Sequence, residues 1–133
     1  MSVDTNTRVG TGEYLPPELM ETNFKNDNCD RYYSDLFALG IIIFKFLLNG
    51  THPYQAKGAL VKDLASTVAK IKKGYFAYGG LFSGVEPPNH ALPYDIIPPS
   101  IQDLFFKCFV DGHKEPKKRP TAKEWLNVLK AES

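Results

Sequence analysis

LFALGIIIFKFLL, residues 36–48, is the longest apolar run of the sequence, and Lys45 alone interrupts it. A run of this length falls short of the roughly 18 residues that predict a membrane-spanning helix, so it predicts a helix buried in a protein core. A helix that is apolar on nearly every side has to be surrounded by the rest of the fold. Asp35 precedes the run, where its carboxylate is expected to cap free backbone N–H groups. The sequence therefore predicts a central helix over residues 35–48.

Further helices are predicted on both sides of this central helix. Residues 15–20, LPPELM, suit one short helical turn, because proline is tolerated at a helix start. Residues 59–73 carry apolar side chains at spacings of three and four, which predicts one amphipathic helix with lysines on its outer side. Residues 74–99 are rich in glycine and proline without a sustained period, so we expect a long loop there.

The C-terminal part predicts two more helices. Ser100 is expected to cap a helix over residues 100–110, and TAKE, residues 121–124, matches the capping box that opens a last helix over residues 121–131. The core side chains expected in the last helix are Trp125, Leu126, Val128 and Leu129. No run predicts a strand. The fold class that follows is all-α, with about five helices around the buried central helix.

Composition excludes several function classes. The 133 residues are 43% apolar and 13% aromatic, which is enough for one domain with a hydrophobic core. Sixteen Lys and Arg against fifteen Asp and Glu give a net charge of +1, so neither nucleic acid nor an anionic membrane is an expected partner. Cys29 and Cys108 belong to no CxxC pair, and the first residues have no signal-peptide pattern. We therefore expect buried thiols and a cytoplasmic protein.

Motifs that hold cofactors or metals are missing. GTGEYL, residues 10–15, begins like a dinucleotide-binding fingerprint but has Leu15 at the third glycine position. His52, His90 and His113 are too far apart for metal-ligand spacing, so each is expected to be solvated or to cap a loop. No catalytic, cofactor-binding or metal site is predicted in the chain.

Three blocks nevertheless resemble the C-terminal part of the protein kinase family. GTGEYLPPEL, residues 10–19, resembles the end of the activation segment, GTPEYxAPEL. SDLFALG, residues 34–40, resembles SDVWSLG, and RPTAKEWL, residues 119–126, resembles R-P-[ST]-x-x-E-x-L. The blocks occur in the family's order and span almost the whole chain. Residues 71–80 and 108–129 further resemble a bacterial group of Ser/Thr kinase-like proteins.

The resemblance implies structural roles for three charged residues. Glu18 and Arg119 stand where the family has a buried ion pair, whereas two unrelated surface charges are the alternative. Asp35 stands where the family has an Asp that accepts hydrogen bonds from amides of the catalytic loop, and a plain helix N-cap is the alternative. Without a catalytic loop in this sequence, only the N-cap is open to Asp35.

The resemblance also marks a substrate loop at Thr11, Gly12, Glu13 and Tyr14. Thr11 stands where the family has a hydroxyl that bonds the catalytic Asp, and an ordinary turn hydroxyl is favoured for this chain by itself. Gly12 replaces the family's usual Pro, which loosens the loop. Pro16 replaces the usual Ala.

The catalytic motifs of a kinase do not occur in the sequence: it has no Gly-rich phosphate loop, no VAIK Lys, no HRD and no DFG. We therefore expect the C-terminal lobe of a Ser/Thr protein-kinase-like protein, inactive alone, while ATP and Mg are implied for the complete kinase. A stand-alone module that binds a peptide or protein is the alternative, and an unrelated helical domain would need three coincident motifs.

The expected partners follow from this interpretation. They are the missing N-terminal half of a kinase, or a protein or peptide substrate. Without that half, the central helix should expose apolar surface, and we expect homo-oligomers, with exchange of residues 1–14 between chains as one route.

Overall fold

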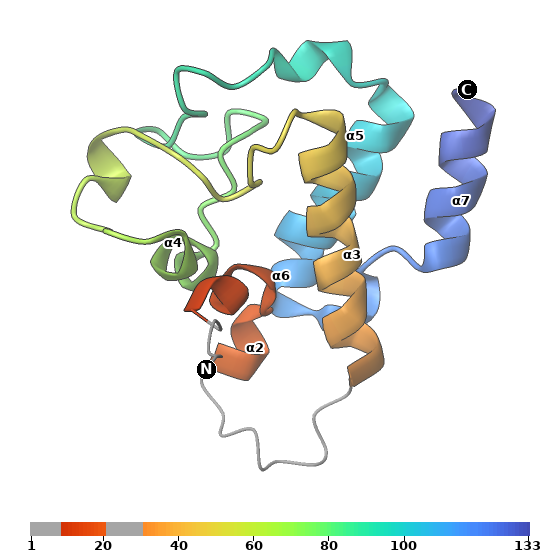
Figure 1. Ribbon diagram of the computed structural model, residues 1–133, viewed down its shortest axis with the longest axis horizontal. Coiled ribbons are helices and arrows are strands. Elements are labelled where there is room, and N and C mark those ends of the chain that lie inside the picture. The colour runs from red at the N-terminus through yellow and green to blue at the C-terminus, as the bar shows by residue number, and fades with distance from the viewer. Residues whose placement is uncertain (1–8, 21–30) are drawn as a thin grey trace.

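The computed structural model describes residues 9–20 and 31–133, and this part of the chain is helical (Figure 1). Within residues 9–20 and 31–133 no strand occurs, and a single isolated bridge pairs Lys57 with Glu86. The fold class is all-α, as the sequence predicts. The α-helices are α2 (Pro17–Met20), α3 (Arg31–Leu47), α4 (Thr67–Lys73), α5 (Pro99–Phe106), α6 (Gly112–Lys114) and α7 (Ala122–Ala131). Shorter turns are the 3₁₀ helices η1 (Val9–Tyr14), η2 (Ala59–Val61), η3 (Tyr94–Ile96) and η5 (Pro116–Lys118), and the π-helix η4 (Lys107–Asp111).

The central helix α3 runs through the middle of the molecule, with α4 and α7 on opposite sides of it in Figure 1. It already includes Arg31, so Asp35 lies in its second turn and is exposed. The expectation that Asp35 caps this helix is therefore wrong. The buried residues of the helix, Leu36, Phe37, Gly40, Ile41 and Phe44, all lie within the apolar run, and the helix begins before the run in a more polar turn.

An aromatic core packs against the inner face of α3. Phe44 is fully buried, and its ring centroid lies 5.1 Å from that of Tyr78, 4.8 Å from that of Phe105 and 6.0 Å from that of Phe109. These rings come from the loop after α4, from α5 and from η4, so one side chain of α3 joins three segments. Each pair adds about 0.5–1.5 kcal/mol to the stabilisation that comes from burying its area.

Residues 59–73 do not form the single helix that their apolar spacing predicts. The 3₁₀ turn η2 ends at Val61, and α4 begins only at Thr67, with Ser66 as its N-cap. Two contacts explain the break. The Leu60 N–H donates to the Gly84 carbonyl at 3.0 Å, and the Ser66 hydroxyl accepts from the Ala69 N–H at 3.1 Å. The long-range bond of Leu60 and the cap by Ser66 thus replace the backbone bonds that one continuous helix would make between η2 and α4.

The helix predicted over residues 100–110 has different limits and a different start. Pro99 is its first residue, and Pro98 at the N-cap makes no side-chain bond. Ser100 is not the cap, because its hydroxyl bonds the Glu132 carboxylate at 2.5 Å instead. After α5 the helix widens into η4 and continues as α6, so the helical segment ends at Lys114 rather than at the predicted residue 110.

The last helix, α7, has the capping box that its sequence predicts. The Thr121 hydroxyl accepts from the Glu124 N–H at 3.1 Å, and the Glu124 carboxylate accepts from the Thr121 N–H at 2.9 Å. Trp125 is buried against Phe105. Leu126 is 56% exposed, so its predicted place in the core is wrong. It follows Trp125 by one position, which turns it about 100° away from the packed face.

Candidate functional site

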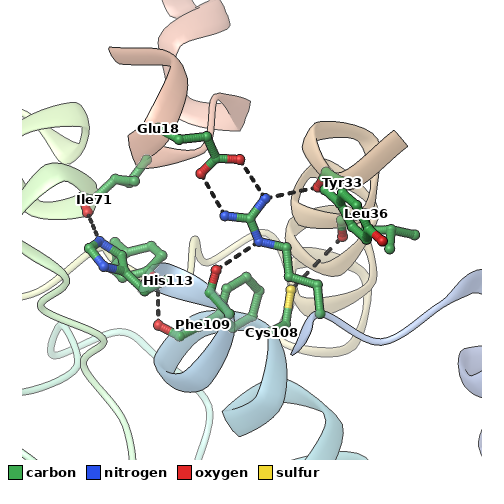
Figure 2. Close-up of polar contacts among 10 residues, drawn as sticks. Glu18, Tyr33, Leu36, Ile71, Cys108, Phe109 and His113 are labelled. Atoms are coloured by element: carbon green, nitrogen blue, oxygen red, sulfur yellow. Dashed lines mark hydrogen bonds and ion pairs between the residues drawn. The ribbon is translucent and has the colours of Figure 1, made fainter. Parts of the chain in front are cut away.

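The side chain of Arg119 is fully buried and faces Glu18 of α2 (Figure 2). Its Nη1 donates to Glu18 Oε2 at 2.8 Å and its Nη2 donates to Oε1 at 2.7 Å. This is the contact that the sequence resemblance implies. A two-point pair of this kind fixes the orientation of both groups, because the planar guanidinium matches the carboxylate.

Two further bonds complete the surroundings of Arg119. Its Nη1 donates to the Tyr33 carbonyl of α3 at 2.9 Å, and its Nε donates to the Gly112 carbonyl of α6 at 2.8 Å. The guanidinium also lies 4.9 Å from the ring centre of Phe37, which is a cation–π distance. A Cβ on Gly112 would lie 2.5 Å from Arg119 Cγ, so a larger residue there would displace the arginine. Arg119 therefore ties α2, α3 and α6 together.

The substrate loop predicted at residues 11–14 lies in η1, directly before α2. The side chain of Thr11 falls outside the described part of the chain, so its predicted role stays a prediction. Gly12 lies against α4, because a Cβ there would be 2.9 Å from Val68 Cγ2. The loop thus rests on α4 at a distance that glycine permits.

His52, in the loop after α3, holds the backbone of this substrate loop. Its Nδ1 accepts from the Tyr54 N–H at 3.0 Å, which leaves Nε2 to donate to the Glu13 carbonyl at 2.7 Å. Burial lowers the pKa of His52 to about 4, so the ring is neutral at neutral pH. His52 is buried rather than solvated, and of the two roles expected for it, it has the loop-capping one.

Lys45 reaches the same loop from α3. Its Nζ donates to the Tyr14 hydroxyl at 2.9 Å and lies 5.2 Å from the centre of the Tyr14 ring. In the sequence, Lys45 stands out only as the interruption of the apolar run, and its contact with Tyr14 is not evident. The signal that could have marked it is the rarity of a charged residue within a helix that has to be buried.

His113 connects α6 to the C-terminal end of α4. The residue before it, Gly112, accepts a bond from Arg119. The His113 Nε2 donates to the Ile71 carbonyl at 2.6 Å, the contact drawn on the left of Figure 2. Burial is the main reason that its pKa lies below the usual value. Cys108, one turn earlier, is a buried free thiol whose pKa burial raises to about 12, whereas Cys29 falls outside the described residues. The buried Cys108 thiol is therefore not placed to act as a nucleophile.

The outer face of α3 carries exposed apolar side chains. Phe46 is 84% exposed and Ile42 is 55% exposed, and Tyr32 and Asp35 are also at the surface. These four residues follow one another at spacings of three, four or seven, so they share one side of the helix. The structure thus presents an apolar stripe with one carboxylate.

The described residues do not provide a metal centre. Within residues 9–20 and 31–133, no group of three or more His, Cys, Asp and Glu side chains could hold an ion. In the same part of the chain, no helix is long and apolar enough to cross a membrane.

Comparison with known proteins identifies the family. The family model of the protein kinase domain matches residues 1–129. The chain belongs to the protein kinase domain family. It is similar to protein kinase YegI of Escherichia coli O157:H7, with 29% identity over 133 residues that cover 91% of this chain and 19% of that protein. It is equally similar to serine/threonine-protein kinase PKZ1 of Phytophthora infestans strain T30-4, with 29% identity over 96% of this chain and 28% of that protein.

The kinase-family chain therefore spans less than a third of either relative. Aurora/IPL1-related protein kinase 2 of Caenorhabditis briggsae matches 54% of the chain with 35% identity. The search of solved structures gave no significant match. The helical fold is that of a protein-kinase-like chain, and both Glu18 and Arg119 lie within the matched residues 1–129.

Proposed function

We propose that this chain is the C-terminal lobe of a Ser/Thr protein kinase of bacterial type, expected inactive alone, which supplies the substrate-side scaffold for phosphoryl transfer from ATP in the complete protein. The observation that carries the proposal is the ion pair of Arg119 with Glu18, which anchors α2 directly after the substrate loop. Gly12 against Val68 and Glu13 against His52 hold that loop on the surface. The printed name of PKZ1 supports the serine/threonine specificity.

ATP and Mg belong, in this proposal, to the part of the kinase domain outside this sequence. Phosphoryl transfer depends on a phosphate-covering loop, a lysine and carboxylates that carry the metal. The sequence has none of the corresponding motifs, and the described residues do not fit a magnesium ion. No step of the reaction is therefore assigned to this chain.

The remainder of the kinase domain is the proposed partner of the outer face of α3. Phe46 and Ile42 would lose their exposed apolar area on docking, at a gain of about 25 cal/mol for each Å² removed from water. The carboxylate of Asp35 on the same face would accept hydrogen bonds from backbone N–H groups of that partner, as the family resemblance implies.

For the chain by itself, we propose homo-oligomers in which a second copy covers the outer face of α3. A cytoplasmic location is also part of the proposal and rests on the two cysteines, which belong to no CxxC pair.

The inactivity of the chain alone is tested with labelled ATP and a generic basic protein. We expect transfer no greater than that of a heat-denatured sample. Transfer that exceeds this background and persists after repurification would contradict the proposal. The Arg119→Ala variant is the matched control, because activity that depends on the folded chain has to fall with it, whereas activity of a contaminant does not.

The alternative is a stand-alone module that binds a peptide or protein. The genomic sequence upstream of Met1 separates the two functions. A reading frame that encodes a Gly-rich loop, HRD and DFG in continuity with this chain supports the kinase lobe, and its absence supports the module.

A further inference from the structure

Lys45 is a positively charged group that directly contacts the substrate loop, through Tyr14. It lies on α3, and both α3 and α4 pack against η1. Its Nζ contacts Tyr14 through both the hydroxyl and the ring face. Arg119, which binds Glu18 in the segment after the loop, is neutralised by that carboxylate. The lysines of α4, Lys70, Lys72 and Lys73, are further cations on a helix that packs against η1. His52 also contacts the loop, at the Glu13 carbonyl, and it is neutral at neutral pH.

Lys45 has no carboxylate partner in residues 9–20 and 31–133. The ion pairs given for this part of the chain have Lys57, Lys107, Lys118 or Arg119 as their cation. The carboxylate of Glu13, the acidic group nearest in sequence to Tyr14, is not within 4.0 Å of the Lys45 ammonium. Lys45 is partly buried. A partly desolvated ammonium without a counter-ion is unfavourable, so a carboxylate that arrives with a ligand gains more here than it does at a fully exposed lysine.

The hydrogen-bonding capacity of the pair points to an anion. An ammonium group has three N–H donors, and Lys45 uses one of them on Tyr14. The Tyr14 oxygen accepts that bond, so its own O–H is still available to donate. Two adjacent donors, one of them charged, match the two oxygens of a carboxylate.

We infer that Lys45 and Tyr14 select an Asp or Glu side chain in the peptide that lies along the substrate loop. This inference rests on the proposed function, because it assumes that a substrate peptide contacts residues 11–14. It adds a substrate class: segments with a carboxylate near the Ser or Thr that is to be phosphorylated. A basic residue at that place would meet the charge of Lys45 and be rejected.

The test measures binding of fluorescent Ser-centred peptides to the full chain by anisotropy. Three pools carry one Glu, one Gln or one Lys at a varied flanking position. We expect the Glu pool to bind about threefold to fivefold more tightly than the Gln pool, as for one partly exposed ion pair, and the Lys pool to bind most weakly. The preference should decrease as salt is raised.

Variants at Lys45 test whether this residue causes the preference for the Glu pool. Lys45→Arg should keep it, Lys45→Gln should abolish it, and Lys45→Glu should reverse it toward the Lys pool. Lys123→Glu is the matched control, because Lys123 is exposed on α7 and changes the net charge equally. Circular dichroism of each variant shows whether the fold is kept.

The outcomes separate this inference from the function on which it rests. Binding of all pools with equal affinity, or a Glu preference that Lys45→Glu leaves unchanged, overturns the role of Lys45 and leaves the substrate-side scaffold in place. Absence of binding by every pool overturns both. A fourth pool with phosphoserine identifies the anion, and binding of that pool alone contradicts selection of a carboxylate.

Discussion

Arg119 and Glu18 are 101 positions apart in the chain and form a two-point ion pair, with both N···O distances below 3 Å. The arginine side chain is fully buried, whereas that of Glu18 is one-third exposed. The contact joins the segment after the substrate loop to the loop before α7, so it closes the fold between its two ends. A pair of this kind stabilises the folded chain mainly by preventing a buried charge from being left alone.

The first prediction concerns removal of either partner of this pair. Arg119→Ala and Glu18→Ala should each lower the free energy of unfolding by about 3–5 kcal/mol, because each leaves a charge or several polar groups without a partner. Urea denaturation followed by circular dichroism measures the loss. The double variant should cost less than the sum of the two single variants, since the partners share one interaction.

The exposed pair of Lys118 with Glu115 provides the control. Both side chains are more than half exposed, and their N···O distance is 3.3 Å. Glu115→Ala should change the free energy of unfolding by no more than about 1 kcal/mol. Equal losses at Glu115 and Glu18 would show that burial adds nothing to the Arg119 pair.

A second prediction concerns the dependence of stability on pH through His52. The pKa of His52 is about 4 in the folded chain and about 6.5 in an unfolded one. Between these values the unfolded chain binds more protons, so stability is full above about pH 6.5 and is lost as the pH falls toward 4. The loss that His52 causes is on the order of 3 kcal/mol. His113 shifts in the same direction and adds to it.

The measurement compares unfolding curves between about pH 7 and pH 4. Carboxylates titrate in the same range, so the slope of the unsubstituted chain alone does not identify the histidine. His52→Gln should be less stable at neutral pH and should depend less on pH. His90→Gln, in the exposed part of the long loop, should retain the full slope. A His52→Gln variant with an unchanged slope would exclude His52 as the cause.

The structural features that the sequence predicts best are those that depend on residues close together in the chain. The capping box of Thr121 and Glu124 spans three positions, so its pattern was sufficient to place the start of α7. The central helix was found from its apolar run, but its first turn was missed because that turn is polar. The Arg119 contact followed from the resemblance to kinases, since spacing alone carries no information about two residues so far apart.

The site residues that the sequence did not reveal have distant partners. Lys45 and Tyr14 are 31 positions apart, and His52 and Glu13 are 39 apart. Lys45 interrupts the apolar run and the resemblance marks Glu13 and Tyr14, but neither observation indicates which of these residues contact one another. The break before α4 was missed for the same reason, because Leu60 bonds to Gly84 rather than to its own helix. A local sequence pattern does not show whether a backbone N–H will form a helical hydrogen bond or a long-range one.

A third prediction concerns the contact between Gly12 and Val68. Gly12→Ala should displace the loop from α4, because the added Cβ would lie 2.9 Å from Val68 Cγ2 and a valine has little freedom to move. We expect a loss of about 1–3 kcal/mol in the free energy of unfolding and weaker peptide binding. Combining it with Val68→Ala should restore most of the binding. A double variant that binds no better than Gly12→Ala would show that the clash lies elsewhere.

A fourth prediction concerns self-association of the chain by itself. Phe46 and Ile42 form an exposed apolar stripe on α3 together with Tyr32. An exposed patch of neighbouring apolar side chains favours association, because each contact removes apolar area from water. Light scattering over a wide range of concentration should therefore show dimers or larger species. Phe46→Lys should shift the chain toward the monomer, since a lysine in the contact would have to lose its hydration.

Leu126→Lys is the matched control for this shift. Leu126 is exposed to the same degree as Ile42 but lies on α7, away from the stripe. Because both substitutions add one positive charge and remove one apolar side chain, a general effect of solubility would appear in both. Association through α3 requires that Phe46→Lys weakens it and that Leu126→Lys leaves it unchanged. A chain that stays monomeric at every concentration, or equal effects of the two substitutions, would exclude the α3 stripe as the contact surface.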